Sequence, residues 1–473
     1  MTDYSVMKEL TFSSRDEFTR KPIAEKIIKL LDSDIDVSPL IIDGKWGTGK
    51  TEFCFKLKNL IEDVNPNNYK VGYVNAFQAD HTNEPLLTLI SEIVSFYPKK
   101  SYQRKRLIKN AVPYLRLVGG VGLKAGLGFA FGRYAADIPT EFSKGMETIE
   151  EGSKELIDLS LESLIEDQAE ADRSLNTLKN ALNNVATDNP VILLIDELDR
   201  CRPDFAVMML ETIKHVFDVE NVQIILITNA EQLKATIKHS YGSETNSHDY
   251  LYKFFKYQIN LPTAAKDTEG RSVENNVTYF RTVVQASKVI RQEFKDNEFI
   301  YEIPTFLDVG KLSLRKIEQT VRCIETLTIF ENEEQSKSPI VEQILMVFLS
   351  FVYMMDEGIF QEINNKEIDD VNFLRFTNAS QSTVSEYEYS VEDLELKDII
   401  SIIFNKYFGQ ECLFLPTNYF DRQRATQRLG EFLAIYKFGA ETNYLMKFKD
   451  NNSYIYEYID HTINNLLLFD IVK

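Results

Sequence analysis

Residues 44–51 read GKWGTGKT, and this glycine-rich run constrains the fold more than any other feature of the chain. The apolar stretch LIID precedes it at 40–43, and apolar residues recur at a helical period in EFCFKLKNLI at 52–61. A strand, a glycine loop and a helix in this order are the context that the pattern G-x-x-x-x-G-K-T requires. Glycines let the backbone approach an anion closely, and a helix start adds oriented N–H groups. The sequence therefore predicts a phosphate-binding loop.

The side chains of this loop predict a nucleotide and Mg²⁺ as ligands. Lys50 is placed to reach the β- and γ-phosphates, and Thr51 to offer its hydroxyl to Mg²⁺. The alternative is a glycine turn that binds no ligand. We expect the nucleotide to contact the following residues: Gly44, Trp46, Gly47, Thr48, Gly49, Lys50, Thr51 and Glu52.

A second motif, VILLIDELDR, occupies residues 191–200. Its apolar residues predict a buried strand, and Asp196 lies at the carboxyl end, where parallel sheets bind ligands. We expect Asp196 to bind Mg²⁺ together with Thr51. Glu197 follows directly and is placed to orient and deprotonate an attacking water. The alternative is that both acids are solvated and cap a turn.

Polar and cationic residues near these motifs are further candidates. Thr228 and Asn229 end another apolar run, where they either contact the γ-phosphate or the attacking water, or cap the next helix. Arg200 follows the acidic pair, and Arg315 begins a predicted helix. Each arginine either stabilises charge that develops during phosphoryl transfer or forms a surface ion pair. We expect Glu197, Lys50, Arg315 and Arg200 to be the catalytic residues.

Strands and helices alternate through the first part of the chain. Apolar runs predict strands at 40–43, 70–74, 191–195 and 222–227, and 256–261 is a weaker candidate for a fifth strand. Helical patterns occupy 84–95, 172–187 and 205–218 between them, and the chain beyond about residue 270 is mostly helical. Such alternation, with near-continuous apolar strands, predicts an α/β fold with a parallel sheet buried on both faces.

The motifs suggest a division of the chain into four parts. We expect an ATPase core at 1–98 and 173–265, a helical insertion at 99–172, a lid-like helical subdomain at 266–335 and a helical interaction region at 336–473. The glycine-rich segment 111–137 is interrupted by Arg116, Lys124 and Arg133, so we do not expect it to span a membrane. It packs closely against other helices, or it contacts a membrane surface or a partner. The apolar run 344–355 is too short to span and predicts a buried helix.

The charge balance restricts the partners. Lys and Arg number 53 against 72 Asp and Glu, which gives a net charge of −19 and disfavours binding to phosphate backbones. A local basic cluster at 98–109 is either a solvated helix face or a contact for DNA, RNA or an acidic protein. The N-terminal residues contain no apolar signal-peptide run, so we expect a cytoplasmic protein, with peripheral membrane association left open.

These motifs together resemble the KAP family of P-loop NTPases. The resemblance rests on GKWGTGKT, on LLIDELDRCRP with the helix and strand that follow, on YLYKFFKYQINLP and on SLRKIEQTVRCIE, which together span about residues 10–330. It implies a P-loop NTPase sheet of the additional-strand, catalytic-glutamate type, with ATP and Mg²⁺ as cofactors. It also assigns the roles given above to Lys50, Thr51, Asp196 and Glu197. Two departures are the missing paired membrane helices and the Thr228–Asn229 pair, where members often have Asp.

The resemblance also implies a biological role, because bacterial members include proteins implicated in defence against bacteriophage. We expect an ATP-hydrolysing switch in anti-phage defence that regulates a partner effector or another regulatory protein, as a homo-oligomer or a hetero-complex. Two alternatives stay open: a nucleotide-gated scaffold with little turnover, and a nucleic-acid-associated ATPase. The guanine motif N/T-K-x-D is absent from the sequence, which favours ATP over GTP.

Overall fold

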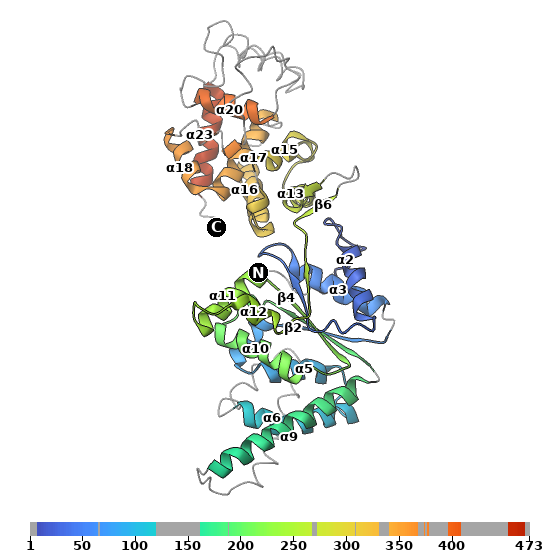
Figure 1. Cartoon of the computed structure of the whole chain (residues 1–473). Helices are drawn as coiled ribbons and strands as arrows, with labels where there is room; N and C mark the ends of the chain where they lie inside the picture. The colour runs from blue at the N-terminus through green and yellow to red at the C-terminus, as the bar shows by residue number, and fades with distance from the viewer. Residues whose placement is uncertain are drawn as a thin grey trace. The chain divides into compact units, whose positions relative to one another are not determined.

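The computed structural model describes residues 7–64, 67–119, 161–187, 189–266, 272–307, 309–330, 340–367, 373, 376–377, 396–407 and 453–468. The chain forms two compact units, Met1–Pro262 and Thr263–Lys473. The first unit contains the sheet, and the described part of the second unit is almost entirely helical (Figure 1).

A five-stranded parallel sheet is the centre of the first unit. Its strands are β1 (Leu40–Asp43), β2 (Lys70–Asn75), β3 (Val191–Asp196), β4 (Val222–Thr228) and β5 (Tyr257–Asn260), in the order β2-β3-β4-β1-β5. All five predicted strands are therefore confirmed. Strand β4 lies between the strand of the glycine loop and the strand of the acidic motif, which is the additional-strand arrangement that the family resemblance implied.

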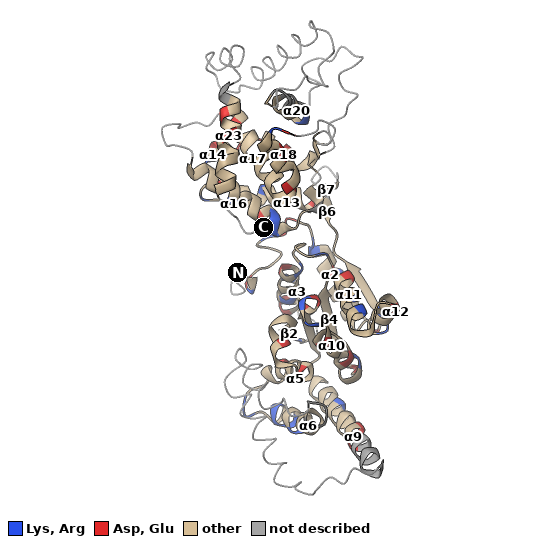
Figure 2. Ribbon diagram, turned by 90° about the vertical axis from the view of Figure 1, so that its left-hand side faces the viewer, with Lys and Arg blue, Asp and Glu red and all other residues tan. Residues whose placement is uncertain are grey.

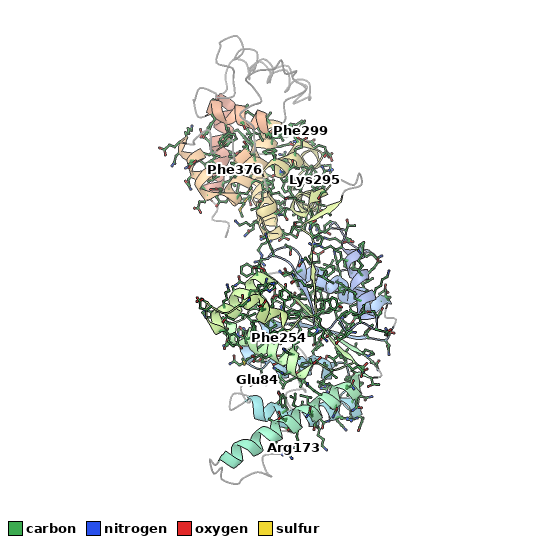
Figure 3. All side chains as sticks on the ribbon, in the orientation of Figure 1. Glu84, Arg173, Phe254, Lys295, Phe299 and Phe376 are labelled. Carbon is green, nitrogen blue, oxygen red and sulfur yellow. The ribbon has the colours of Figure 1, made fainter. Side chains whose placement is uncertain are left out.

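Helices cover both faces of this sheet because successive side chains of each strand point to opposite sides. On β3, Ile192 and Leu194 join a core with α2 (Lys21–Leu31) and α3 (Lys50–Val64). Leu193 and Ile195 join the opposite core, with α5 (Pro85–Ser95), α10 (Pro203–Val216) and α11 (Ala230–Tyr241). The side chains of both layers fill the space between sheet and helices (Figure 3). The remaining elements of this part are α4 (Ala76–Ala79), η1 (Asp80–Thr82), η3 (Leu198–Arg200) and α12 (Ser247–Tyr252).

Two helices follow β2 and precede β3 in the sequence: α6 (Tyr102–Gly119) and α9 (Leu161–Ala186). They pack against each other. Most of the glycine-rich segment 111–137 and much of the acidic stretch before α9 lie outside the described residues. Lys and Arg residues are spread along α6 (Figure 2). Arg104 of the basic cluster is buried, however, and donates to the Tyr97 carbonyl at 3.4 Å, so this cation is not part of an open surface. In the described parts of the chain, no helix is long and apolar enough to cross a membrane.

The second unit begins with a short antiparallel hairpin, β6 (Ala264–Lys266) with β7 (Ser272–Glu274), which the sequence did not predict. Helix α17 (Ile340–Met355) is buried over nearly its whole length, which confirms the buried helix predicted at 344–355. Helices α13 (Asn275–Ala286), α15 (Phe299–Phe306), α16 (Leu314–Phe330), α18 (Glu357–Asn365) and α23 (Ser453–Leu468) are in contact with one another or with α17. The other elements are α14 (Gln292–Lys295), η4 (Val309–Lys311) and α20 (Leu396–Tyr407).

Candidate functional site

The glycine loop joins β1 to α3 and has a backbone that requires its glycines. Gly47 and Gly49 have φ angles of 72° and 78°, in the left-handed region that side chains with a Cβ rarely adopt. At Gly44 a Cβ would lie 2.9 Å from the Thr48 hydroxyl oxygen, so a larger residue there would have to displace that side chain. The Thr48 hydroxyl in turn donates to the Lys45 carbonyl at 2.8 Å. The loop is therefore a compact turn in front of a helix N-terminus, the arrangement that binds phosphates.

Lys50 begins α3 and lies buried across this loop. Its Nζ donates to the carbonyls of Gly44 at 2.7 Å and Lys45 at 3.0 Å. Burial lowers the pKa of this ammonium, and the carboxylates of Asp199 and Asp196 oppose the shift. A desolvated cation beside a glycine loop favours a polyanionic ligand, because the ligand restores the interactions that water supplied.

Asp196 and Thr51 meet at the carboxyl end of β3. Asp196 is fully buried, and its carboxyl forms a hydrogen bond with the Thr51 side chain. The Tyr73 hydroxyl, from β2, also donates to this carboxyl at 3.3 Å. Burial raises the pKa of Asp196 to about 6, and the Thr51 hydrogen bond opposes that rise. The structure thus brings together the two residues that the sequence assigned to Mg²⁺.

Glu197 follows with a left-handed backbone, φ 62°, which is uncommon for a residue other than glycine. Such conformations cluster at functional sites and cost about 1 kcal/mol or more. Both oxygens of the buried carboxylate have partners: Asn75 Nδ2 donates to Oε2 at 3.0 Å, and Arg200 pairs with Oε1 at 3.0 Å. Arg200 therefore lies beside the predicted base, as an ion-pair partner whose side chain is partly exposed.

Asp199 is a site residue that the sequence reasoning missed. Its buried carboxylate accepts from the Trp46 indole of the glycine loop and, at 3.0 Å, from the Thr228 hydroxyl at the end of β4. The backbone N–H of Gly44 also donates to the Thr228 carbonyl at 3.2 Å. The acid therefore ties the loop to β3 and β4. Its position three residues after Asp196, in the same turn, was the available signal.

The remaining predicted site residues are Asn229, Glu52 and Arg315, and the structure places them as follows. Asn229 caps α11, because its side chain accepts from the Gln232 N–H at 3.4 Å, which favours the capping alternative. Glu52 pairs with Lys56 at 2.6 Å on α3. Arg315 is the second residue of α16, at a helix start as predicted, and is exposed in the second unit.

The residues at this site fit a nucleotide with Mg²⁺. The glycine loop leaves its backbone close to a ligand, and Lys50 supplies a cation. The hydroxyl of Thr51 and the carboxylate of Asp196 are hard oxygen donors of the kind that Mg²⁺ prefers. Phosphate oxygens and water complete the coordination in such sites.

Comparison with known proteins agrees with this geometry. A model of the KAP family P-loop domain matches residues 20–332, about two-thirds of the chain. The match includes the glycine loop, the acidic motif and α16. No curated protein matches the sequence. The chain belongs to the KAP family of P-loop NTPases.

Proposed function

We propose that this protein is an ATP-hydrolysing molecular switch. The observation that carries the proposal is the contact between Thr51 and Asp196 at the same sheet edge as Lys50 and Glu197. Residues that only bind the nucleotide and Mg²⁺ would be sufficient for a protein that senses a nucleotide without hydrolysing it. A buried carboxylate immediately after the metal-ligand candidate supplies, in addition, a base for water, which hydrolysis requires.

Each residue has a distinct part in the proposed reaction. Lys50 and the loop N–H groups hold the β- and γ-phosphates, while Thr51 and Asp196 hold Mg²⁺, which neutralises phosphate charge when bound. Glu197 accepts a proton from water as the water oxygen bonds to the γ-phosphorus. The bond from that phosphorus to the bridging oxygen breaks, and ADP and phosphate are the products. Arg200 and Arg315 are the candidates to stabilise the charge that develops.

The contacts of Glu197 are compatible with the role of base. An ionised carboxylate offers about four acceptor positions on its two oxygens. Asn75 donates to one oxygen and Arg200 pairs with the other, so each of these two partners takes one acceptor position on its oxygen. We propose that Asn75 orients the carboxylate rather than blocking it.

Measurements of turnover and of binding together test this proposal. The single tryptophan, Trp46, lies in the loop and is about half exposed, so its fluorescence reports nucleotide binding. We expect Lys50→Ala to lose binding, and Glu197→Gln to bind ATP while turnover falls at least about a hundredfold. Lys58→Ala is the matched control, because Lys58 is on α3 and pairs only with the surface residue Glu62 in its described contacts.

The results separate the alternatives. A Lys50→Ala protein that hydrolyses ATP at the wild-type rate would overturn the site assignment. Tight ATP binding without single-turnover hydrolysis would support the nucleotide-gated scaffold instead. Faster hydrolysis of GTP than of ATP would contradict the choice of adenine.

We propose further that the switch acts in the cytoplasm in bacterial anti-phage defence and regulates an effector protein. The support is the family membership. We propose for this switch the predicted division into a core (1–98 and 173–265), an insertion (99–172), a lid-like subdomain (266–335) and an interaction region (336–473). Plaque formation on bacteria that express the protein tests the role. Protection by the wild type that persists in Lys50→Ala would argue against an ATP-dependent defence function.

A further inference from the structure

The segment that leaves the first unit is hydrogen-bonded to the residue that directly precedes the glycine loop. After β5 the chain passes through Leu261 and Pro262, and Thr263 begins the second unit. The Leu261 N–H donates to the Asp43 carbonyl at 2.9 Å, and Asp43 directly precedes Gly44. Gln258 of β5 adds a contact to the Asp43 carboxylate at 3.2 Å. A change in the loop can therefore reach the exit of the unit over a short path.

Arg20 makes a second connection, on the other side of the loop. One terminal nitrogen of its guanidinium donates to the Thr48 carbonyl at 2.8 Å, and the other donates to the Pro262 carbonyl at 3.3 Å. The two acceptors belong to the phosphate loop and to the last residue of the unit. A planar guanidinium with separated donors can bridge them, whereas a lysine ammonium is a single point donor group.

The position of Arg20 is held from several directions. The Asp16 carboxylate accepts from the backbone N–H of Arg20 at 2.8 Å, which anchors this residue before α2. The guanidinium stacks over the Phe18 ring, 4.7 Å from its centroid. Burial lowers the pKa of Arg20 to about 10, opposed by the carboxylates of Glu52, Glu17 and Asp16, so the side chain remains a cation at neutral pH.

Two observations argue for more than a structural role. The Nε–H of Arg20 is buried without a hydrogen-bond partner in the described structure, an arrangement that costs stability. Thr48, whose carbonyl it binds, lies between Gly47 and Gly49, which both have positive φ angles. Glycines permit a peptide plane to rotate at low cost, so this carbonyl can reorient when phosphates bind the loop.

We propose that Arg20 is a positioning residue that couples the state of the phosphate loop to the 261–262 segment, through which the chain enters the second unit. This inference rests on the proposed function, since it needs nucleotide binding at the loop. It adds the route by which that binding is reported to the rest of the chain.

Hydrogen–deuterium exchange of the full-length protein tests the coupling. The Leu261 amide is the reporter, because it is bonded to Asp43 at the loop, and peptides covering 257–266 contain it. We expect saturating ATPγS with Mg²⁺ to change its exchange rate by at least about threefold in the wild type. In Arg20→Lys, we expect ATPγS affinity, read from Trp46 fluorescence, to stay within about threefold while the exchange response becomes smaller, since only the Leu261–Asp43 connection remains.

Arg15→Lys is the matched control, because it is the same substitution at a nearby arginine whose ion-pair partners are the carboxylates of Glu17 and Glu52. Arg20→Gln keeps one neutral donor and repeats the measurement if Arg20→Lys unfolds. An exchange response of wild-type size in either folded Arg20 variant overturns the coupling while leaving the proposed function intact. If ATPγS changes neither the Trp46 fluorescence nor the hydrogen–deuterium exchange of the wild-type protein, both proposals are overturned.

Discussion

At the scale of single residues, the site depends on side chains that come from distant parts of the chain. Asp199 and Trp46 are 153 positions apart, and Arg20 and Pro262 are 242 apart. The motif residues Lys50, Thr51, Asp196 and Glu197 could be found in the sequence because their spacing is local. Asp199 and Arg20 could not be assigned partners, because only the strand order brings their contacts together.

Asn75 is a site residue that the sequence would have indicated if the order of the strands had been known. It ends β2 and is paired in register with Asp196 at the end of β3. Parallel strands present their carboxyl ends at one edge, so a polar residue ending β2 was a reasonable candidate once β2 and β3 were known to be neighbours. The sequence predicted both strands but not their adjacency.

The Asn75→Asp variant tests whether this residue orients the proposed base. The substitution keeps the acceptor that caps α4, where Asn75 accepts from the Gln78 N–H at 2.9 Å, but it replaces the donor to Glu197 with a carboxylate. Two adjacent carboxylates hold a proton between them, so a smaller fraction of Glu197 is ionised and able to accept a proton from water near neutral pH. We expect kcat for ATP to fall at least about tenfold near pH 7 and to recover partly at higher pH, with KM within about threefold.

The control for this experiment is Asn184→Asp, an exposed position on α9. It adds the same charge without a contact to the site in the described residues. A wild-type rate and pH profile in Asn75→Asp would show that the contact to Glu197 has no part in turnover.

At the scale of elements, burial on both faces decided which strands the sequence could predict. Strand β3 is buried at every position and appears in the sequence as an uninterrupted apolar run. Strand β5 is an edge strand with only partial burial, and its apolar signal was correspondingly weak. Strands β6 and β7 have three residues each, too few for any periodicity to appear.

Helix α5 carries a prediction about pH at this scale. The helix is buried from Pro85 to Val94, and the preceding residue Glu84 makes no side-chain capping bond. Figure 3 labels Glu84 beside this helix. Burial alone raises the pKa of Glu84 from 4.5 to about 7. The folded protein therefore binds this proton more tightly than the unfolded chain does, so stability is lost as the pH rises from 4.5 through about 7.

We expect Glu84→Gln to remove the decrease in stability that ionisation of Glu84 causes as the pH rises. Because Glu84 is only half-buried, the gain in unfolding free energy is about 1 kcal/mol near pH 8, and it disappears toward pH 4.5. Urea unfolding at both pH values measures it, with Glu25→Gln on the exposed side of α2 as control. A difference between Glu84→Gln and wild type that does not depend on pH would contradict the assignment.

At the scale of the whole molecule, the net charge of −19 opposes the ligand that the site is built to hold. The glycine loop and Lys50 act within a few ångströms, where ions of the solvent do not intervene because the ammonium is buried. The field of the whole chain acts over longer distances and is screened by salt. The net charge therefore indicated which partners are disfavoured, while the proposal of a nucleotide ligand follows from the local geometry of the loop.

This separation predicts an unusual salt dependence for nucleotide binding. Raising the ionic strength from about 10 to about 100 mM shortens the Debye length from about 30 to about 10 Å and so screens the repulsion between the acidic protein and ATP·Mg. We expect the association rate, followed by stopped-flow Trp46 fluorescence at constant free Mg²⁺, to rise about twofold. The less charged ADP·Mg complex is the control and should respond more weakly. An association rate that falls with salt would mean that a positive local field, rather than the net charge, governs the approach of the nucleotide.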